Sequence, residues 1–158
     1  LKHGPEELTA EAELLLMNAS RVQLVREVIR PAIAAGEIVL CDRFYDSTTV
    51  YQGTGRGLDA AQVQAVIDFA VGDTRPDLTL FLQIPLKTSE ERRARRSETD
   101  RFEQADRTFF ERIEAGYTAL ATAEPNRIRV IEADQSLDTV ATAIWRIVSD
   151  RLKSDKSR

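Results

Sequence analysis

Hydrophobic residues recur at helical spacing in four long stretches of the chain. These stretches are residues 9–35, 59–70, 103–123 and 137–152. Each places its larger apolar side chains along one face, which is typical of an amphipathic helix packed on a core. Thr9 and Asp59 stand where their side chains can cap the first two helices. Pro31 is a candidate kink in the first helix, and Gly36 is a natural end for it.

Three short apolar runs lie between these helices. They are "EIVLC" at 37–41, "DLTLFLQI" at 77–84 and "RIRVIEA" at 127–133. They are too short for helices and read as buried strands. Strands that alternate with helices predict an α/β fold with a parallel sheet flanked by helices. Ligands bind such sheets at the carboxyl ends of strands, so Asp42 and Arg43 are expected at a ligand site.

The length of the chain predicts one compact domain over residues 1–152, followed by a polar tail at 153–158. Trp145 in the last helix is expected in the core. Cys41 reads as a small buried hydrophobe. We assign no role to His3, which lies in the polar start of the chain.

Charge and composition exclude several classes of protein. The net charge of −4 and the pI near 5.2 argue against a general binder of nucleic-acid polymers or membrane surfaces. No apolar stretch approaches the roughly 18 residues of a membrane span. A single cysteine excludes an internal disulfide and fits a reducing, cytoplasmic compartment. No cluster of cysteine and histidine is present to bind a metal.

The segment "CDRFYDSTTVYQGTGRG", residues 41–57, carries the densest candidate chemistry. Asp42 can either face a metal-bound phosphate or cap a turn. Arg43 can either grip a phosphate with its guanidinium fork or form a surface ion pair. The glycines around Arg56 are expected to leave backbone amides free to approach an anion. The segment matches neither the dinucleotide fingerprint nor a Walker A loop.

A second candidate is the arginine-rich stretch "ERRARRSETDRFE", residues 91–103. A charge run is usually a solvated helix face. Arginine is also the residue that clamps a transferring phosphoryl group, and the absence of lysine from the stretch favours a phosphate-facing role. The arginines concerned are Arg92, Arg93, Arg95, Arg96 and Arg101.

Together, "SRVQLVREVIRPAIAAGEIVLCDRFYDSTTVYQGTGRGLD", "DLTLFL" and "RARRSETDRFE" resemble bacterial thymidylate kinase over roughly residues 10–150. That family transfers the γ-phosphoryl group of ATP to thymidine monophosphate with magnesium, a step in dTTP synthesis. The resemblance implies the fold of a P-loop nucleoside monophosphate kinase, in which helices wrap a five-stranded parallel sheet. It also implies a mobile lid at about residues 87–103 and a cytoplasmic homodimer.

The resemblance assigns roles to the first helix and to the Asp-Arg motif. Arg21 matches the arginine that hydrogen-bonds the thymine base, and Met17 stands where the family usually has a stacking phenylalanine. Asp42 and Arg43 match the Asp-Arg-Tyr motif, with Phe44 in place of the tyrosine. Arg43 would grip the acceptor phosphate, and Asp42 would lie near the magnesium ion.

The following residues match the wall of the acceptor pocket. Ser47 and Thr48 fall where small polar residues line the nucleotide. Tyr51 matches a tyrosine beside the deoxyribose, where a ring can exclude a 2′-hydroxyl group. Gln52 belongs to the same wall, and Arg56 belongs to the same acceptor motif.

The arginine-rich stretch resembles the lid of the bacterial subtype, in which lid arginines reach the ATP phosphates. Arg92 and Arg96 match this role best, and Arg93 and Arg95 accompany them. The loop after the third strand resembles the wall on the adenine side of ATP. Its residues are Ala133, Asp134 and Gln135.

The chain departs from the family at its start. The family begins with a strand, a Gly-rich Lys-Ser/Thr phosphate loop, a second strand and a "REPGG"-like motif, and none of these occurs here. The first strand would lie between those predicted at 37–41 and 77–84, so each is expected to present an unpaired edge. We therefore expect a chain truncated at its start, whose 158 residues do not themselves turn over thymidine monophosphate.

Two alternatives remain open at this point. One is a related nucleotide kinase that acts on another monophosphate or on a deoxynucleoside. The other is a non-catalytic remnant that binds nucleotide or only dimerises. The density of arginines argues against a module that only dimerises, and a phosphate loop encoded upstream of Leu1 would exclude it.

Overall fold

The computed structural model describes residues 8–94 and 107–155. The chain divides into two compact units, residues 1–76 with 104–118 and residues 77–103 with 119–158. Each unit is described by itself below. The prediction of a single domain over residues 1–152 stays a prediction.

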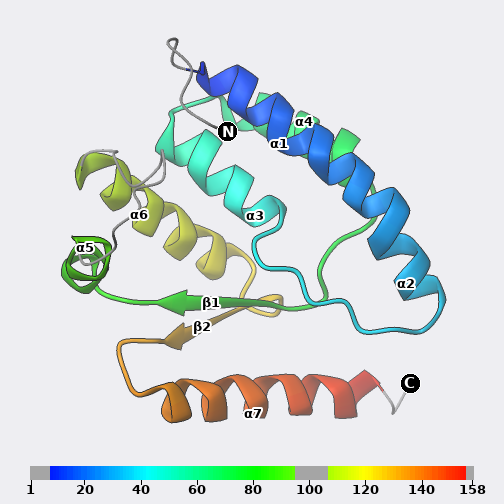
Figure 1. Ribbon diagram of the computed structural model, residues 1–158, viewed down its shortest axis with the longest axis vertical. Helices are drawn as coiled ribbons and strands as arrows, with labels where there is room; N and C mark the ends of the chain where they lie inside the picture. The colour runs from blue at the N-terminus through cyan, green and yellow to red at the C-terminus, as the bar shows by residue number, and fades with distance from the viewer. Residues whose placement is uncertain (1–7, 95–106, 156–158) are drawn as a thin grey trace. The chain divides into compact units, whose positions relative to one another are not determined.

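The first unit begins with a long helix whose three parts follow one another directly (Figure 1). These parts are α1 (Ala10–Leu24), the π-helical η1 (Val25–Ile29) and α2 (Arg30–Ala34). The Thr9 hydroxyl accepts the Ala12 amide at 3.2 Å, so the predicted cap is confirmed. Pro31 lies in the first turn of α2, directly after the wide π-helical turn. Gly36 ends the helix at a φ of 78°.

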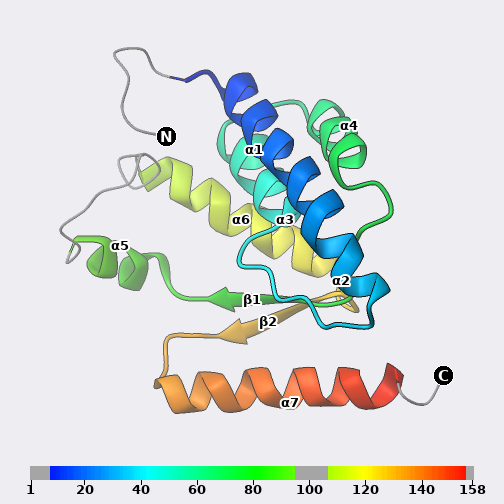
Figure 2. The same ribbon diagram turned by 45° about the vertical axis from the view of Figure 1, so that its right-hand side comes forward.

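A second helical segment was not predicted from the sequence. It consists of α3 (Tyr45–Thr48) and the π-helical η2 (Thr49–Gly55). The predicted helix after Asp59 is α4 (Ala60–Val71), and the Asp59 carboxylate accepts the Gln62 amide at 3.0 Å. Helix α4 lies beside α1, as Figure 2 shows. The buried side chains between these helices are Leu14, Val25, Ile29, Tyr45, Val63, Ile67, Ala70 and Val71.

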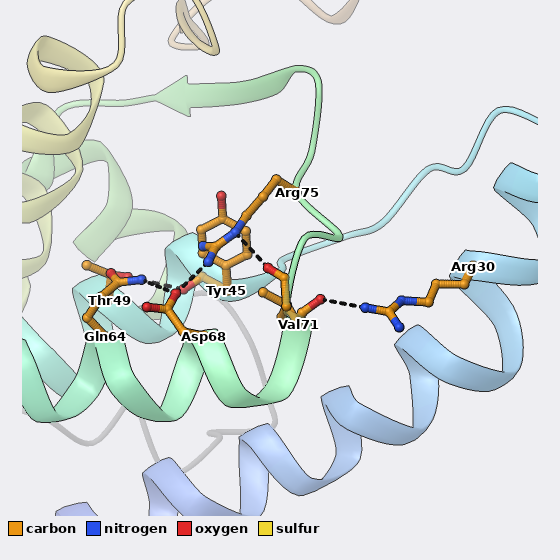
Figure 3. Close-up of polar contacts among 8 residues, drawn as sticks. Arg30, Tyr45, Thr49, Gln64, Asp68, Val71 and Arg75 are labelled. Atoms are coloured by element: carbon orange, nitrogen blue, oxygen red, sulfur yellow. Dashed lines mark hydrogen bonds and ion pairs between the residues drawn. The ribbon is translucent and has the colours of Figure 1, made fainter.

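Two arginines hold the end of α4 in place (Figure 3). Arg75 donates to the Asp68 carboxylate and to the Gly72 carbonyl, and its guanidinium carbon lies 4.9 Å from the centre of the Tyr45 ring. Arg30 donates to the Val71 carbonyl at 3.3 Å. These contacts tie the last turn of α4 to α2 and α3, and so support the segment that carries the Asp-Arg motif.

The prediction of a strand at residues 37–41 is wrong. The segment is extended chain without ladder partners among the described residues, and Ile38 and Leu40 are 70% and 90% exposed. A strand needs a neighbour that satisfies its backbone groups and covers its side chains, and no described segment supplies one. Asp42 and Arg43 therefore follow an unpaired segment rather than a strand end.

Helix α6 (Arg107–Ala123) closes the core of the first unit with its N-terminal part. It confirms the described part of the helix predicted at 103–123; residues 103–106 lie outside the described residues. Phe109 and Ile113 are 3% and 8% exposed. A Cβ atom on Gly55 would lie 2.8 Å from both side chains, so the glycine permits η2 to approach α6 closely.

The second unit contains a small parallel sheet. Strands β1 (Thr79–Gln83) and β2 (Ile128–Glu132) pair from Thr79 with Ile128 to Gln83 with Glu132. These two strands confirm the cores of the runs predicted at 77–84 and 127–133. Helix α5 (Leu86–Ala94) follows β1, and α7 (Leu137–Asp155) packs against β2 (Figure 1).

Two core predictions are wrong. Trp145 is 67% exposed, and Cys41 is exposed. Periodicity locates the apolar face of a helix, but packing decides which residues at its margin are covered. Cys41 is exposed because the segment that carries it forms no strand.

None of the described helices combines the length and the apolar character that a membrane crossing requires.

Candidate functional site

The Asp-Arg motif begins the candidate site with an unusual backbone conformation. Arg43 has a φ of 62°, the one positive φ outside glycine among the described residues. This left-handed conformation costs a non-glycine residue roughly 1 kcal/mol or more, and such strain concentrates at functional sites. The turn that contains it leads from the exposed segment at 37–41 into α3.

Helix α3 and η2 bring three of the predicted site residues together. The Arg43 Nε atom donates to the Ser47 hydroxyl at 3.4 Å. The Arg43 guanidinium carbon lies 4.3 Å from the centre of the Tyr51 ring. At this separation the ring face attracts the cation and holds the plane of the guanidinium group. Arg43 is itself exposed, so its charge is available to an anion.

The sequence reasoning missed Tyr117, which α6 contributes to this group. Its hydroxyl lies 2.9 Å from the Ser47 hydroxyl. Burial raises the pKa of Tyr117, while the hydrogen bond with Ser47 and the charge of Arg43 lower it. The phenol therefore stays neutral at physiological pH. A tyrosine on an otherwise apolar helix face was the available signal, since a buried hydroxyl needs a partner.

Helix α1 contributes the base-side candidates. Arg21 donates to the Asn18 side chain at 2.9 Å and to the Phe44 carbonyl at 3.3 Å, and it lies over the Phe44 ring. Burial lowers the pKa of Arg21, although the nearby Cys41 thiol opposes this shift. An arginine nevertheless stays protonated in proteins. Met17 lies one turn earlier in α1 and is half-buried.

A buried carboxylate on the same helix was also missed. Glu13 is 1% exposed, and its two oxygens accept from different residues. Gln52 donates to one at 2.6 Å, and Arg56 forms an ion pair with the other at 3.3 Å. The signal was a glutamate at the start of "ELLL", on a helix face that is otherwise apolar.

The glycine-rich part of the segment does not form an open cradle for an anion. Gly53 and Gly55 lie within η2, and both are buried. The amides of Arg56 and Gly57 donate to the carbonyls of Tyr51 and Gly53. The expectation of free amides here is therefore wrong, because the glycines serve close helix packing.

The remaining acceptor-side candidates differ in exposure. Thr48 is 2% exposed and belongs to the interior of the first unit. Asp42 is exposed, and its carboxylate makes no hydrogen bond or ion pair with a described residue.

The described residues include no group of three or more histidine, cysteine, aspartate or glutamate side chains that could hold a metal. Mg²⁺ commonly takes one or two carboxylates, with phosphate and water as its other ligands, so Asp42 fits only such a shared site.

The second unit brings one lid candidate to the predicted adenine-side loop. Arg92 in α5 forms an ion pair with Asp134 at 3.5 Å, and the Thr88 hydroxyl donates to the same carboxylate at 3.1 Å. Arg93 donates to the Ser89 hydroxyl at 2.9 Å. Arg95 and Arg96 lie outside the described residues.

The other two residues of that loop extend the sheet edge. The Ala133 amide donates to the Gln83 carbonyl at 2.7 Å, so the parallel ladder continues one residue past β2. The side-chain amide of Gln135 donates to the carboxylate of Glu132 at 3.3 Å. The loop is thereby fixed to the carboxyl ends of both strands, where open parallel sheets bind ligands.

Comparison with known proteins identifies the family. Residues 1–144 match the family model for thymidylate kinase. The chain is 46% identical to a thymidylate kinase of Alcanivorax borkumensis, over 92% of this chain and 70% of that protein. It is 51% identical to one of Methylococcus capsulatus, over 85% of this chain and 64% of that protein. The chain belongs to the thymidylate kinase family.

A solved structure supports the same assignment. The crystal structure of thymidylate kinase from Ehrlichia chaffeensis matches with a TM-score of 0.70 and 26% identity, over 90% of this chain and 66% of that one. The match confirms the predicted α/β fold of P-loop nucleoside monophosphate kinase type. Thymidylate kinases are transferases that use ATP as phosphate donor, and the positions described above are the candidate site of this member.

Proposed function

We propose that this chain binds thymidine monophosphate as phosphate acceptor, in the ATP-dependent reaction that produces thymidine diphosphate for dTTP synthesis. The observation that carries the proposal is the arrangement of Arg43, Ser47 and Tyr51, with the strained arginine exposed and oriented. A planar, permanently charged group held in one orientation is suited to a bidentate grip on a phosphate.

On this proposal each acceptor-side residue has a distinct task. Arg43 holds the acceptor phosphate, and Tyr51 lies against the deoxyribose. Arg21 and Met17 meet the base from α1, with Arg21 held by Asn18 and the Phe44 carbonyl. Ser47 fixes the guanidinium of Arg43, and Thr48, Gln52 and Arg56 complete the wall.

We assign the donor side to the arginines of α5 and to those that follow it in the sequence. Phosphoryl transfer depends on position and on neutralised charge, and arginines supply both. We assign Arg92 and Arg96 to the ATP phosphates, with Arg93 and Arg95 in support. The loop formed by Ala133, Asp134 and Gln135 is assigned to the adenine side. The ion pair between Arg92 and Asp134 holds the arginine until a nucleotide competes for it.

We assign Asp42 to the magnesium ion that accompanies ATP. Its exposed carboxylate, free of ion pairs to described residues, is suited to share the ion with phosphate oxygens and water. The ion would neutralise phosphate charge, and Asp42 would hold it beside Arg43.

We further propose a homodimer in the cytoplasm. Several large apolar side chains of the long first helix are exposed, and an exposed apolar surface of this kind favours association. They are Leu15 at 58%, Leu16 at 48%, Leu24 at 38%, Val28 at 53% and Ile33 at 54% exposure. Sedimentation velocity on the purified chain measures the assembly, and a monomer at all concentrations contradicts it.

Calorimetric titration tests the proposed function directly. We expect the chain to bind thymidine monophosphate and to bind adenosine monophosphate much more weakly. Equal affinity for both nucleotides, or no binding of either, contradicts the proposal. A coupled ADP-release assay on the 158 residues tests the separate prediction that they do not themselves turn over the substrate.

A further inference from the structure

The strongest unassigned feature is the buried carboxylate of Glu13. A charged group with 1% exposure is stable in a protein only when its charge is paired and its oxygens are hydrogen-bonded. Arg56 supplies the countercharge, and Gln52 supplies a short hydrogen bond of 2.6 Å. Both partners come from the segment that the proposed function assigns to the acceptor nucleotide.

The charge of Glu13 decides which way the Gln52 amide faces. An ionised carboxylate only accepts hydrogen bonds, so Gln52 must present its NH₂ group to Glu13. Its amide oxygen then has no hydrogen-bond partner among the described residues. Gln52 is 3% exposed, so there is little room for the side chain to take another conformation. The side-chain oxygen of Gln52 can therefore accept a hydrogen bond from a ligand, while its NH₂ group is held by Glu13.

Glu13 also lies on the same face of α1 as the two base-side candidates. Glu13, Met17 and Arg21 follow one another at intervals of four residues, which places them in one row along the helix. The residues that Glu13 holds therefore lie beside the row that carries the proposed contacts to the base.

We propose that Glu13 is a positioning residue for nucleotide selection, because it orients Gln52 and Arg56 from beneath. This inference rests on the proposed binding of thymidine monophosphate. An acceptor oxygen on Gln52 favours a base that donates a hydrogen bond. Thymine carries an N3–H donor at its Watson–Crick edge, whereas the same ring atom of cytosine is an acceptor. Glu13 thus contributes to the preference for thymine over cytosine without touching the nucleotide.

The test compares Glu13→Gln with Glu11→Gln by calorimetric titration of dTMP and dCMP. Glu13→Gln keeps the shape of the side chain but removes its charge. The side-chain amide of Gln52 can then rotate, so that its oxygen and its NH₂ group exchange places. We expect dTMP affinity to fall at least about tenfold, the loss typical of a hydrogen bond to a charged group. The ratio of dTMP to dCMP affinity should fall with it. Glu11 is exposed on the same helix, so Glu11→Gln should change neither value.

A second variant covers the case in which Glu13→Gln does not fold. Glu13→Asp keeps the negative charge near Arg56 but withdraws the oxygen from Gln52, and it should lower the same ratio. The inference is overturned if a folded variant, as judged by circular dichroism, binds both nucleotides as the unsubstituted chain does. It is also overturned if affinity for both falls in equal proportion, or if neither variant folds, because Glu13 then serves stability alone. Failure of the unsubstituted chain to bind dTMP instead overturns the proposed function.

Discussion

Arg43 lies over Tyr51, with the guanidinium carbon 4.3 Å from the centre of the ring. The two residues are joined through η2 and α3, which the sequence pattern did not predict. The left-handed backbone of Arg43 lies where the chain passes from the exposed segment at 37–41 into the helix. The proposed phosphate contact and the backbone strain therefore fall on the same residue.

Removal of the Arg43 side chain should weaken nucleotide binding. We expect Arg43→Ala to lower dTMP affinity by about 2 kcal/mol, the usual value for a hydrogen bond to a charged group. Calorimetric titration measures the loss, and Arg26→Ala is the matched control because Arg26 is exposed on η1. Unchanged affinity in the Arg43 variant removes this residue from the phosphate site.

The strain at Arg43 gives a separate prediction for stability. Arg43→Gly and Arg43→Ala lose the same contacts, but glycine adopts a φ of 62° without the clash of a Cβ atom. The glycine variant should be more stable than the alanine variant by about 1 kcal/mol. Urea denaturation of the two variants measures the difference. A glycine variant of equal or lower stability shows that the backbone is not strained there.

Two glycines of η2 should respond differently to the same substitution. A methyl group on Gly55 would lie 2.8 Å from Ile113 and Phe109, so Gly55→Ala should destabilise the fold by about 1–3 kcal/mol. The nearest atom to a methyl group on Gly53 is a Val63 carbon at 3.9 Å, so Gly53→Ala should be neutral or slightly stabilising. Thermal denaturation compares the pair, and equal changes contradict the close packing of η2 on α6.

The contact between Asp68 and Arg75 should make stability depend on acid pH. The hydrogen bond from Arg75, aided by one from Gln64, lowers the pKa of Asp68. A lowered folded-state pKa contributes stability above the unfolded value, which is lost as the pH falls below about 4. Asp68→Asn should flatten the acid side of the stability curve. Parallel curves for the variant and the unsubstituted chain contradict this contribution.

Helix positions were largely predictable from the sequence. Thr9 and Asp59 carry local capping signals that depend on a few neighbouring residues, and both caps formed as predicted. The strands predicted from the apolar runs formed at 79–83 and 128–132, because each pairs with the other within the described chain. The run at 37–41 carries the same pattern without such a partner, and it stays extended and exposed.

The candidate site was predictable as residue types but not as contacts. Arg43 was a candidate from its place directly after an apolar run, and Arg21 and Tyr51 were candidates through the resemblance of their motifs. Glu13 and Tyr117 were not found, because their polar atoms matter only through partners that are 39 and 70 residues away in sequence. The expectation that glycine amides lie free also failed, since the burial of Gly53 beside α4 and of Gly55 beside α6 became visible only in the folded chain.

The sequence by itself determined the family, the helices with their caps and the dense set of arginines, because these depend on local order and spacing. The tertiary structure alone decided which polar groups meet. It set the amide of Gln52 against Glu13, the hydroxyl of Ser47 against Tyr117 and the guanidinium of Arg43 over Tyr51. The physical reason is that burial makes each polar atom depend on a partner, and packing of distant segments selects that partner.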